Sequence, residues 1–220
     1  MNSPWQFQQW QSSFAGKILS VLTGNRPSRG AAHFQRLYDA DADPWHFRTS
    51  TYEQAKYQKS LAALPERRFR SAFEIGCSIG MFTHLLAPRC DAVLGVDIVE
   101  QPLHDARTAC ADQPWVRFQQ MQVPADWPDG TFDLIVMSEV LYFLSKQDIA
   151  TVIDRVCACL DATGLVLLVN WRGRSGDPCT GDEAAEYFIR GTSERLEPHV
   201  QYQEEKYRLD LMGPRQAAGA

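Results

Sequence analysis

The fold of this 220-residue chain is decided by the stretch Ser71-Ala72-Phe73-Glu74-Ile75-Gly76-Cys77-Ser78-Ile79-Gly80-Met81. Its first residues have the pattern of a short buried strand, and an apolar stripe at helical spacing begins at Met81. Between them lies a Gly-rich turn, in which Gly76 and Gly80 would let the backbone approach a ligand closely. The stretch therefore predicts a strand, a nucleotide-binding turn and a helix in that order, although a turn without a ligand can also contain two glycines.

A second apolar run brings an acidic side chain to the same place. The run Ala92–Val96 predicts a strand that ends at Asp97, where a carboxylate can accept hydrogen bonds from both hydroxyls of a ribose. Glu74 lies two residues before Gly76, where it would repel the pyrophosphate of a dinucleotide but attract the ammonium group of a methionyl tail. The two acids therefore predict S-adenosylmethionine as the cofactor and argue against an NAD-linked reductase.

A third segment extends this pattern. Asp129-Gly130 predicts a turn before the buried strand Phe132–Met137, which ends in Ser138-Glu139. Together with the Gly-rich turn and Asp97, it resembles the class I S-adenosylmethionine-dependent methyltransferases, from about Phe73 to about Val169. The resemblance implies an α/β, Rossmann-like fold: a mostly parallel seven-stranded sheet with helices on both faces and an N-terminal helical cap.

The remaining periodicity and turn residues divide the chain into three parts. We expect residues 1–65 to form a helical cap or lid, residues 66–214 to form the methyltransferase domain, and residues 215–220 to form a loose tail. The helices expected are Trp5–Leu22, Ala31–Ala40, Tyr52–Leu64 with Ser50 as its N-cap, Lys146–Leu160 and Ala184–Ile189; the further strands expected are Val116–Gln119, Leu165–Asn170 and a terminal strand over Tyr202–Met212.

The resemblance implies a cofactor site at the carboxyl ends of the strands. Glu74, Gly76 and Gly80 would surround the methionyl part, and Asp97 would hold the ribose. The adenine would lie between Ile98 and Met121, with the Gln122 amide at its exocyclic amine, while Cys77, Ser78 and Ser138 complete the predicted cofactor-binding set. Ser78 replaces the middle glycine of many methyltransferases, so the backbone angles of the turn are the open point.

Methyl transfer from a sulfonium is an in-line displacement, so the protein mainly aligns the reacting groups and removes a proton from an ammonium acceptor. Glu139 follows the strand where the methyl group should point, and is the first candidate for that proton acceptor. Its alternative role is a helix-capping carboxylate. Tyr142 is a second candidate catalytic residue, which could equally be a packing residue.

Aromatic and basic residues before the Gly-rich turn suggest a lid. Trp45, Phe47, Tyr52 and Tyr57 could cover the cofactor and attract its sulfonium, with Arg48 or Lys56 pairing its carboxylate. The alternative is that this helix simply docks on the sheet. On the opposite rim, Trp171 suits stacking on a sugar ring, so Trp45 and Trp171 are the predicted substrate-binding residues.

A narrower resemblance comes from motifs outside the cofactor turn. The chain is similar to the nodulation protein S (NodS) family, whose members N-methylate the free amine of a deacetylated chitooligosaccharide. An amine of an amino-sugar or a related small molecule is therefore the expected acceptor; a sugar or natural-product O-methyltransferase and an inactive cofactor-binding module are the alternatives. The motifs are Tyr38-Asp39, Asp43 to Phe47, Tyr52 to Tyr57, Ser138 to Leu144, Trp171-Arg172-Gly173, Thr180 to Glu183 and Tyr207 to Leu211.

Composition limits the partners. The net charge of −5 and the pI near 5.5, with no cluster of Lys and Arg, argue against nucleic acid. Cys157-Ala158-Cys159 has no accompanying His/Cys pair at ligand spacing, so no metal site is predicted. The six cysteines fit reduced core thiols in the cytoplasm, and no signal peptide or membrane span is recognised. The oligomeric state is left open.

Overall fold

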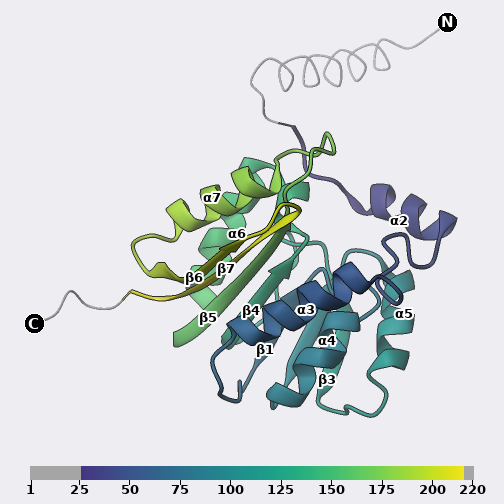
Figure 1. Ribbon diagram of the computed structural model, residues 1–220, viewed down its shortest axis with the longest axis horizontal. Helices are drawn as coiled ribbons and strands as arrows, with labels where there is room; N and C mark the ends of the chain where they lie inside the picture. The colour runs from purple at the N-terminus through teal and green to yellow at the C-terminus, as the bar shows by residue number, and fades with distance from the viewer. Residues whose placement is uncertain (1–25, 216–220) are drawn as a thin grey trace, which may run out of the picture.

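Seven strands form one sheet in the order β3-β2-β1-β4-β5-β7-β6 in the computed structural model, which describes residues 26–215 (Figure 1). Strands β1 to β5 pair in parallel, and β7 runs antiparallel to both of its neighbours. The predicted mostly parallel, seven-stranded sheet is thus confirmed. The strands are β1 Ala72–Ile75, β2 Val93–Asp97, β3 Val116–Gln120, β4 Phe132–Ser138, β5 Leu160–Trp171, β6 Leu196–Gln203 and β7 Tyr207–Pro214.

Helices cover both faces of the sheet (Figure 1). Side chains of α3 and α4 pack on one face, and those of α6 and α7 pack on the other. The helix predicted over Trp5–Leu22 lies outside the described residues. The described helices are α2 Ala31–Ala40, α3 Thr51–Ala63, α4 Met81–Leu86, α5 Glu100–Ala109, α6 Lys146–Cys159 and α7 Gly181–Gly191, with 3-10 turns η1 Ala87–Arg89 and η2 Leu141–Phe143.

The central strand β4 shows why the sheet needs both layers. Leu134 and Val136 contribute to the apolar cluster under α3 and α4, whereas Ile135 and Met137 contribute to the cluster under α6 and α7. All four side chains are fully buried. A strand buried on both faces appears in the sequence as a continuous apolar run, and Leu134–Met137 is such a run.

The helix starts are fixed by local chemistry. The Ser50 side chain accepts a hydrogen bond from the main-chain N–H of Glu53, as an N-cap does, so the predicted start of α3 is confirmed. Thr180 and Glu183 form a reciprocal capping box at the start of α7. This helix therefore begins at Gly181, three residues before the predicted Ala184.

The C-terminal part differs from the prediction. The single strand expected over Tyr202–Met212 is wrong, because β6 and β7 form an antiparallel hairpin that turns after Gln203. The sequence hides β6 because it is an exposed edge strand with polar residues and Pro198, and an edge strand needs no apolar alternation. Strand β5 also begins at Leu160 rather than Leu165. Arg215, expected in a loose tail, donates its main-chain N–H to the Arg195 carbonyl.

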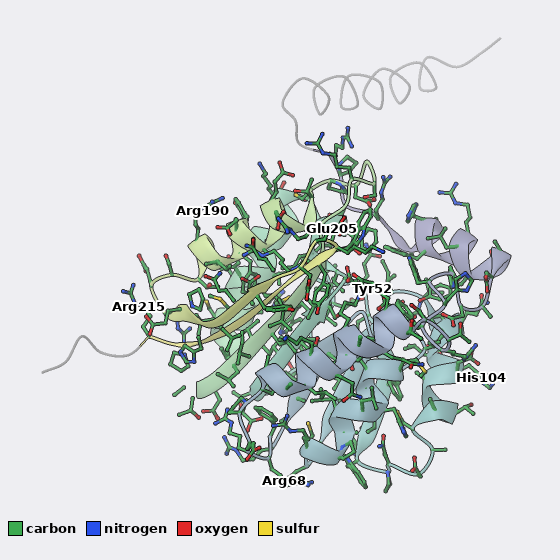
Figure 2. All side chains as sticks on the ribbon, in the orientation of Figure 1. Tyr52, Arg68, His104, Arg190, Glu205 and Arg215 are labelled. Atoms are coloured by element: carbon green, nitrogen blue, oxygen red, sulfur yellow. The ribbon has the colours of Figure 1, made fainter. Side chains whose placement is uncertain are left out.

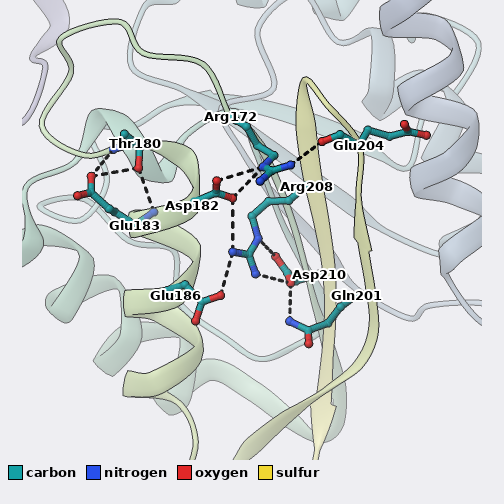
Figure 3. A network of polar contacts seen from close by, with 9 residues as sticks. All are labelled: Arg172, Thr180, Asp182, Glu183, Glu186, Gln201, Glu204, Arg208 and Asp210. Carbon is teal, nitrogen blue, oxygen red and sulfur yellow. Dashed lines mark hydrogen bonds and ion pairs between the residues drawn. The ribbon is translucent and has the colours of Figure 1, made fainter.

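A buried ion network attaches the hairpin to α7 (Figure 3). Arg208 of β7 is 2% exposed and donates two hydrogen bonds to Asp210, at 2.8 and 2.9 Å, and one to Glu186 of α7, at 2.9 Å. Arg172, just after β5, donates to both oxygens of Asp182 at 3.1 Å. Every buried charge in this network has an opposite charge beside it.

The parallel order brings the ends of β1, β2, β4 and β5 to one edge of the sheet, where ligands bind in folds of this kind. Helix α2 and the start of α3 lie at that edge (Figure 1). Figure 2 shows Tyr52 at the first turn of α3, on the side of the hairpin turn that carries Glu205. The ring of Tyr52 contacts that of Tyr207 edge-on, with the centroids 6.1 Å apart.

Candidate active site

A cavity of about 580 Å³ lies at the carboxyl edge of the sheet. Its wall is formed by the Gly-rich turn, by the ends of β2, β4 and β5, and by α2, α3 and the segment between them. Most of the predicted site residues are brought together here. Those that line the cavity are Trp45, Tyr57, Glu74, Gly76, Cys77, Ser78, Asp97, Ile98, Met121, Ser138, Glu139, Tyr142 and Trp171.

Three predicted site residues lie outside the cavity lining. Arg48 is exposed and pairs with Asp105 of α5 at 2.6 Å. Gln122 is exposed, and its main-chain N–H donates to Asp126. Gly80 is buried at the start of α4, behind the turn. The directions of the two exposed side chains, Arg48 and Gln122, depend on contacts with neighbouring elements. A short sequence pattern does not reveal such contacts.

The glycines of the turn are required by protein neighbours. Gly76 has φ +78°, and a Cβ atom there would lie 2.3 Å from a methyl group of Val140. Gly80 has φ +76°, and a Cβ there would lie 2.9 Å from Ala106 of α5. The positive φ angles and these contacts both require glycine at the two positions. Ser78 also adopts a left-handed conformation, with φ +49°, which answers the open point about the turn.

Glu74 is a buried acid that no described cation neutralises. The side chain is 2% exposed, and Thr83 Oγ1 donates to its Oε2 at 2.6 Å. Burial raises the pKa of Glu74 to about 7, against the smaller opposing effect of the Thr83 hydrogen bond. A cation that entered the cavity beside Glu74 would restore the ionised carboxylate.

Asp97 is the second buried acid of the cavity. It is 8% exposed and accepts main-chain N–H groups of Ser78 and Val99, each at 3.0 Å. Burial raises its pKa to about 6, and the main-chain hydrogen bonds oppose this rise. The bond from Ser78 joins the Gly-rich turn to the end of β2. Tyr38 of α2 holds the same serine, with Tyr38 Oη and Ser78 Oγ 2.7 Å apart.

Glu139 receives three hydrogen bonds. Lys56 Nζ donates to its Oε1 at 2.6 Å, while Tyr142 Oη and the main-chain N–H of Trp171 donate to its Oε2 at 2.9 and 2.8 Å. Glu139 has φ +59°, a conformation that few residues other than glycine adopt. Burial, followed by the charge of Glu139, raises the pKa of Tyr142 well above its ordinary value, so this hydroxyl acts as a neutral donor.

Sequence reasoning missed the partner of Glu139. Lys56 was expected to pair with the cofactor carboxylate, but its side chain is 3% exposed and lies between Glu139 and Glu53. Burial would lower the pKa of Lys56, yet the charges of Glu139 and Glu53 raise it overall. The spacing of Glu53 and Lys56 on one helical face was visible in the sequence, whereas their approach to Glu139 was not.

Aromatic side chains supply much of the cavity lining. Phe34 of α2 meets Phe143 edge-on at 5.0 Å, and Trp45 stacks on Phe47 at 5.5 Å. Arg29 donates to Asp177 at 2.8 Å. All of these residues line the cavity. An apolar wall with a few fixed polar groups is typical of a small-molecule site.

Other kinds of site find no support within residues 26–215. No helix among them is long and apolar enough to cross a membrane. No group of three or more His, Cys, Asp or Glu among them could hold a metal ion. The six cysteines all lie in the described part, and none forms a disulfide.

The fold is that of the class I S-adenosylmethionine-dependent methyltransferases. The family model of Nodulation protein S (NodS) matches residues 31–175, and the chain belongs to this family. The Nodulation protein S of Bradyrhizobium diazoefficiens is 34% identical over 103 residues, which cover 46% of this chain and 49% of that protein. The Nodulation protein S of Sinorhizobium fredii is 31% identical over 141 residues, or 64% of each chain. The chain thus spans about half to two thirds of the length of these curated relatives.

Solved structures agree on the fold. A provisionally assigned methyltransferase from Pseudomonas syringae is 34% identical, with a TM-score of 0.63, and the match covers 76% of this chain and all of that chain. The N-methyltransferase NodS from Bradyrhizobium japonicum WM9, in complex with S-adenosyl-L-homocysteine, has a TM-score of 0.72 at 23% identity, over 84% of this chain and 98% of that chain. The predicted Rossmann-like methyltransferase fold is confirmed.

Proposed function

We propose that this protein is an S-adenosylmethionine-dependent N-methyltransferase that acts on an amine of an amino-sugar, an oligosaccharide or a related small molecule. The observation that carries the proposal is a pair of buried acids on the cavity wall: Glu74, in β1 just before the Gly-rich turn, and Asp97, at the end of β2, which accepts the N–H of Ser78 in that turn. Membership of the NodS family supports the amine as acceptor.

The residues of the cavity fit the cofactor. Glu74 is a buried carboxyl without a cation among residues 26–215, and the ammonium group of a methionyl tail would supply one. Asp97 has carboxylate oxygens that can still accept the hydroxyls of a ribose, because a carboxylate offers about four acceptor positions and two main-chain N–H groups use part of them. Ile98 and Met121 supply apolar surface for the adenine.

The bound cofactor supplies an electrophilic methyl group whose bonding electron pair leaves with the sulfur. The protein must then exclude water, orient the acceptor and take up a proton. The aromatic wall formed by Trp45, Phe47 and Phe143 excludes water, and Trp171 offers a face for a sugar ring. Glu139 directly follows β4 and precedes Val140, which contacts Gly76; this supports a position for Glu139 beside the end of the turn that we propose for the methionyl part.

The cap is proposed to act as a lid. Trp45 and Tyr57, from the segments on either side of Arg48, line the same cavity as Glu74. Residues 1–65 would then form the covering part and residues 66–214 the methyltransferase domain. The absence of disulfides among six cysteines supports a reducing location, for which we propose the cytoplasm.

Two measurements test the proposal. Titration calorimetry with S-adenosylhomocysteine should give saturable binding to one site per chain, and mass spectrometry should detect methylated tetraglucosamine after incubation with S-adenosylmethionine. Cellotetraose, which has hydroxyls at the corresponding positions and no amine, is the matched acceptor control. Methylation of cellotetraose alone would indicate an O-methyltransferase, binding without turnover would indicate a cofactor-binding module, and absence of binding would remove the proposal altogether.

A further inference from the structure

We call the part of the cavity around Glu139 the acceptor end. Besides Glu139, it contains a second acid, Glu53, which was not identified as a site residue from the sequence. Glu53 lies in the first turn of α3, is 8% exposed, and lines the cavity together with Lys56 and Glu139. Its backbone is fixed, because its N–H donates to the Ser50 cap. Its carboxylate contacts Lys56 Nζ, which lies 3.0 Å from Oε1 and 2.8 Å from Oε2.

The two carboxylates differ in the number of their donors. Glu139 accepts from Lys56, Tyr142 and the Trp171 N–H, whereas Lys56 is the only described residue that donates to the carboxylate of Glu53. Each donor stabilises the ionised form and uses an acceptor position. The oxygens of Glu139 therefore have fewer free acceptor positions than those of Glu53. Burial, the largest effect at Glu53, raises its pKa, in the direction that favours proton uptake.

We infer that Glu53 accepts the proton of the acceptor ammonium, while Lys56 is a positioning residue that joins Glu53 to the fixed carboxylate of Glu139. This inference rests on the proposed function and names the form in which the acceptor binds, a protonated amine. An N–H bond of the ammonium breaks, its electron pair stays on the nitrogen, and the proton goes to a carboxylate oxygen of Glu53. The ammonium and carboxylate charges disappear together, so the total charge is unchanged.

The charges around this group favour a cation. Glu53 and Glu139 share one ammonium, that of Lys56, which leaves one negative charge in a mostly buried cluster. A positively charged acceptor would balance it, whereas an alcohol would not.

The titratable groups that face this cluster, from α3 itself and from other elements, are mostly neutral tyrosines and acids. Tyr52 and Tyr57 of α3, Tyr142 of η2 and Tyr207 of β7 have raised pKa values, chiefly because they are buried, and stay neutral. The remaining charged neighbours are Glu74 of β1, the paired Arg29 and Asp177, and Lys206, whose Nζ lies 5.5 Å from the Tyr52 ring centroid.

The test compares Glu53→Gln, Glu139→Gln and the surface control Glu66→Gln, which makes the same chemical change at an exposed position. For each variant, S-adenosylhomocysteine affinity is measured by calorimetry, and kcat and KM are measured with tetraglucosamine from about pH 6, where its amines are mostly protonated, to about pH 9.5. For Glu53→Gln we expect roughly a 100-fold loss of kcat at the lower pH, the scale of general base catalysis. Its affinity for S-adenosylhomocysteine should stay within about twofold of the wild type, because Glu53 does not hold the cofactor.

The distinguishing result is recovery at high pH. In Glu53→Gln, kcat should recover by roughly tenfold or more towards about pH 9.5, because the acceptor amine then loses its proton in solution and needs no base. A purely structural role for Glu53 would give a loss that does not depend on pH. For Glu139→Gln, the loss should persist at high pH, because that carboxylate positions and does not accept the proton.

Other outcomes would overturn the inference. Wild-type kcat in Glu53→Gln at about pH 6, or an equal loss at every pH, would remove Glu53 from the proton path. If Glu53→Gln does not fold, as judged by circular dichroism, Glu53→Asp replaces it, and a kcat profile displaced along the pH axis supports the inference while an unchanged one contradicts it. If the wild type binds S-adenosylhomocysteine but methylates no amine, the proposed function fails first and the role of Glu53 with it.

Discussion

Two groups of buried charges in this molecule have opposite designs. Around Arg208, the guanidinium is bonded to Asp210 and Glu186, and the nearby Asp182 is bonded to Arg172 (Figure 3). At the cofactor end, Glu74 and Asp97 have only neutral donors among the described residues. The pKa values differ accordingly. Burial raises the pKa of both Glu74 and Asp97. The neighbouring carboxylates raise the pKa of Arg208, although burial alone would lower it.

The comparison teaches how to separate structural charges from functional ones. A network that is already neutralised needs no ligand, and it holds elements together. Buried acids without a cation cost stability, so their presence in a cavity indicates that a ligand completes them. Four changes would break or sharpen this contrast.

The largest effect is expected from Arg208→Met. Removal of the guanidinium leaves Asp210, which is 1% exposed, as an unpaired buried charge, and should lower the free energy of unfolding by about 4 kcal/mol. Chemical denaturation measures this loss. The double variant Arg208→Met with Asp210→Leu should recover most of the lost free energy of unfolding, because Asp210 is then no longer an unpaired buried charge. A double variant as unstable as Arg208→Met would show that the unpaired charge is not the cause of the loss.

The next effect is the pH dependence of cofactor affinity. Below the pKa values of about 7 for Glu74 and about 6 for Asp97, the free protein must release protons before both acids can bind the cofactor as carboxylates. Affinity for S-adenosylhomocysteine should therefore fall on the order of 100-fold between about pH 8 and about pH 5.5. Calorimetric titrations across this range measure it. A flat profile would mean that neither acid is linked to binding.

Glu74→Gln should have smaller effects, which are opposite in direction for ligand affinity and for the stability of the unliganded protein. Without the carboxylate, affinity for S-adenosylhomocysteine at about pH 8 should fall by about 2 kcal/mol, the scale of a charge-assisted hydrogen bond. The unliganded variant should nevertheless be more stable than the wild type at that pH by about 1 kcal/mol, because it lacks a buried charge.

The stability gain has a defined pH window. The raised pKa of Glu74 means that, between its ordinary value of 4.5 and about 7, the folded protein binds a proton that the unfolded chain does not. Wild-type stability therefore decreases as pH rises through this window, and the advantage of Glu74→Gln should disappear below it. Thermal unfolding at several pH values measures this difference, and an advantage that persists in acid would contradict the explanation.

The smallest effect is expected from Tyr38→Phe. This change removes the 2.7 Å hydrogen bond to Ser78 but keeps the ring that meets Trp45. Affinity for S-adenosylhomocysteine should fall by about 1 kcal/mol, because the serine also donates its N–H to Asp97 and would be less well fixed. Tyr202→Phe, at the end of β6 and outside the cavity lining, is the control that should leave affinity unchanged.

Much of the architecture could be predicted because its signals are local. The start of α3 at the Ser50 cap and the bounds of α2 follow from neighbouring residues. The glycines of the turn were recognised from the sequence, but their close contacts with Val140 and Ala106 were not, because those residues come from other elements. The hairpin was missed because the pairing of β6 with β7 stabilises a segment whose own sequence is a poor strand.

The sequence by itself determined the strand, the Gly-rich turn and the two acids of the proposed cofactor end, because strand and turn preferences act over a few residues and fix the positions of Glu74 and Asp97 within them. Only the tertiary structure decided the acceptor end. Lys56 and Glu139 are 83 residues apart in the chain and 2.6 Å apart in space. Such a contact depends on how α3 packs against the sheet, and packing is a property of whole surfaces rather than of any short stretch of sequence.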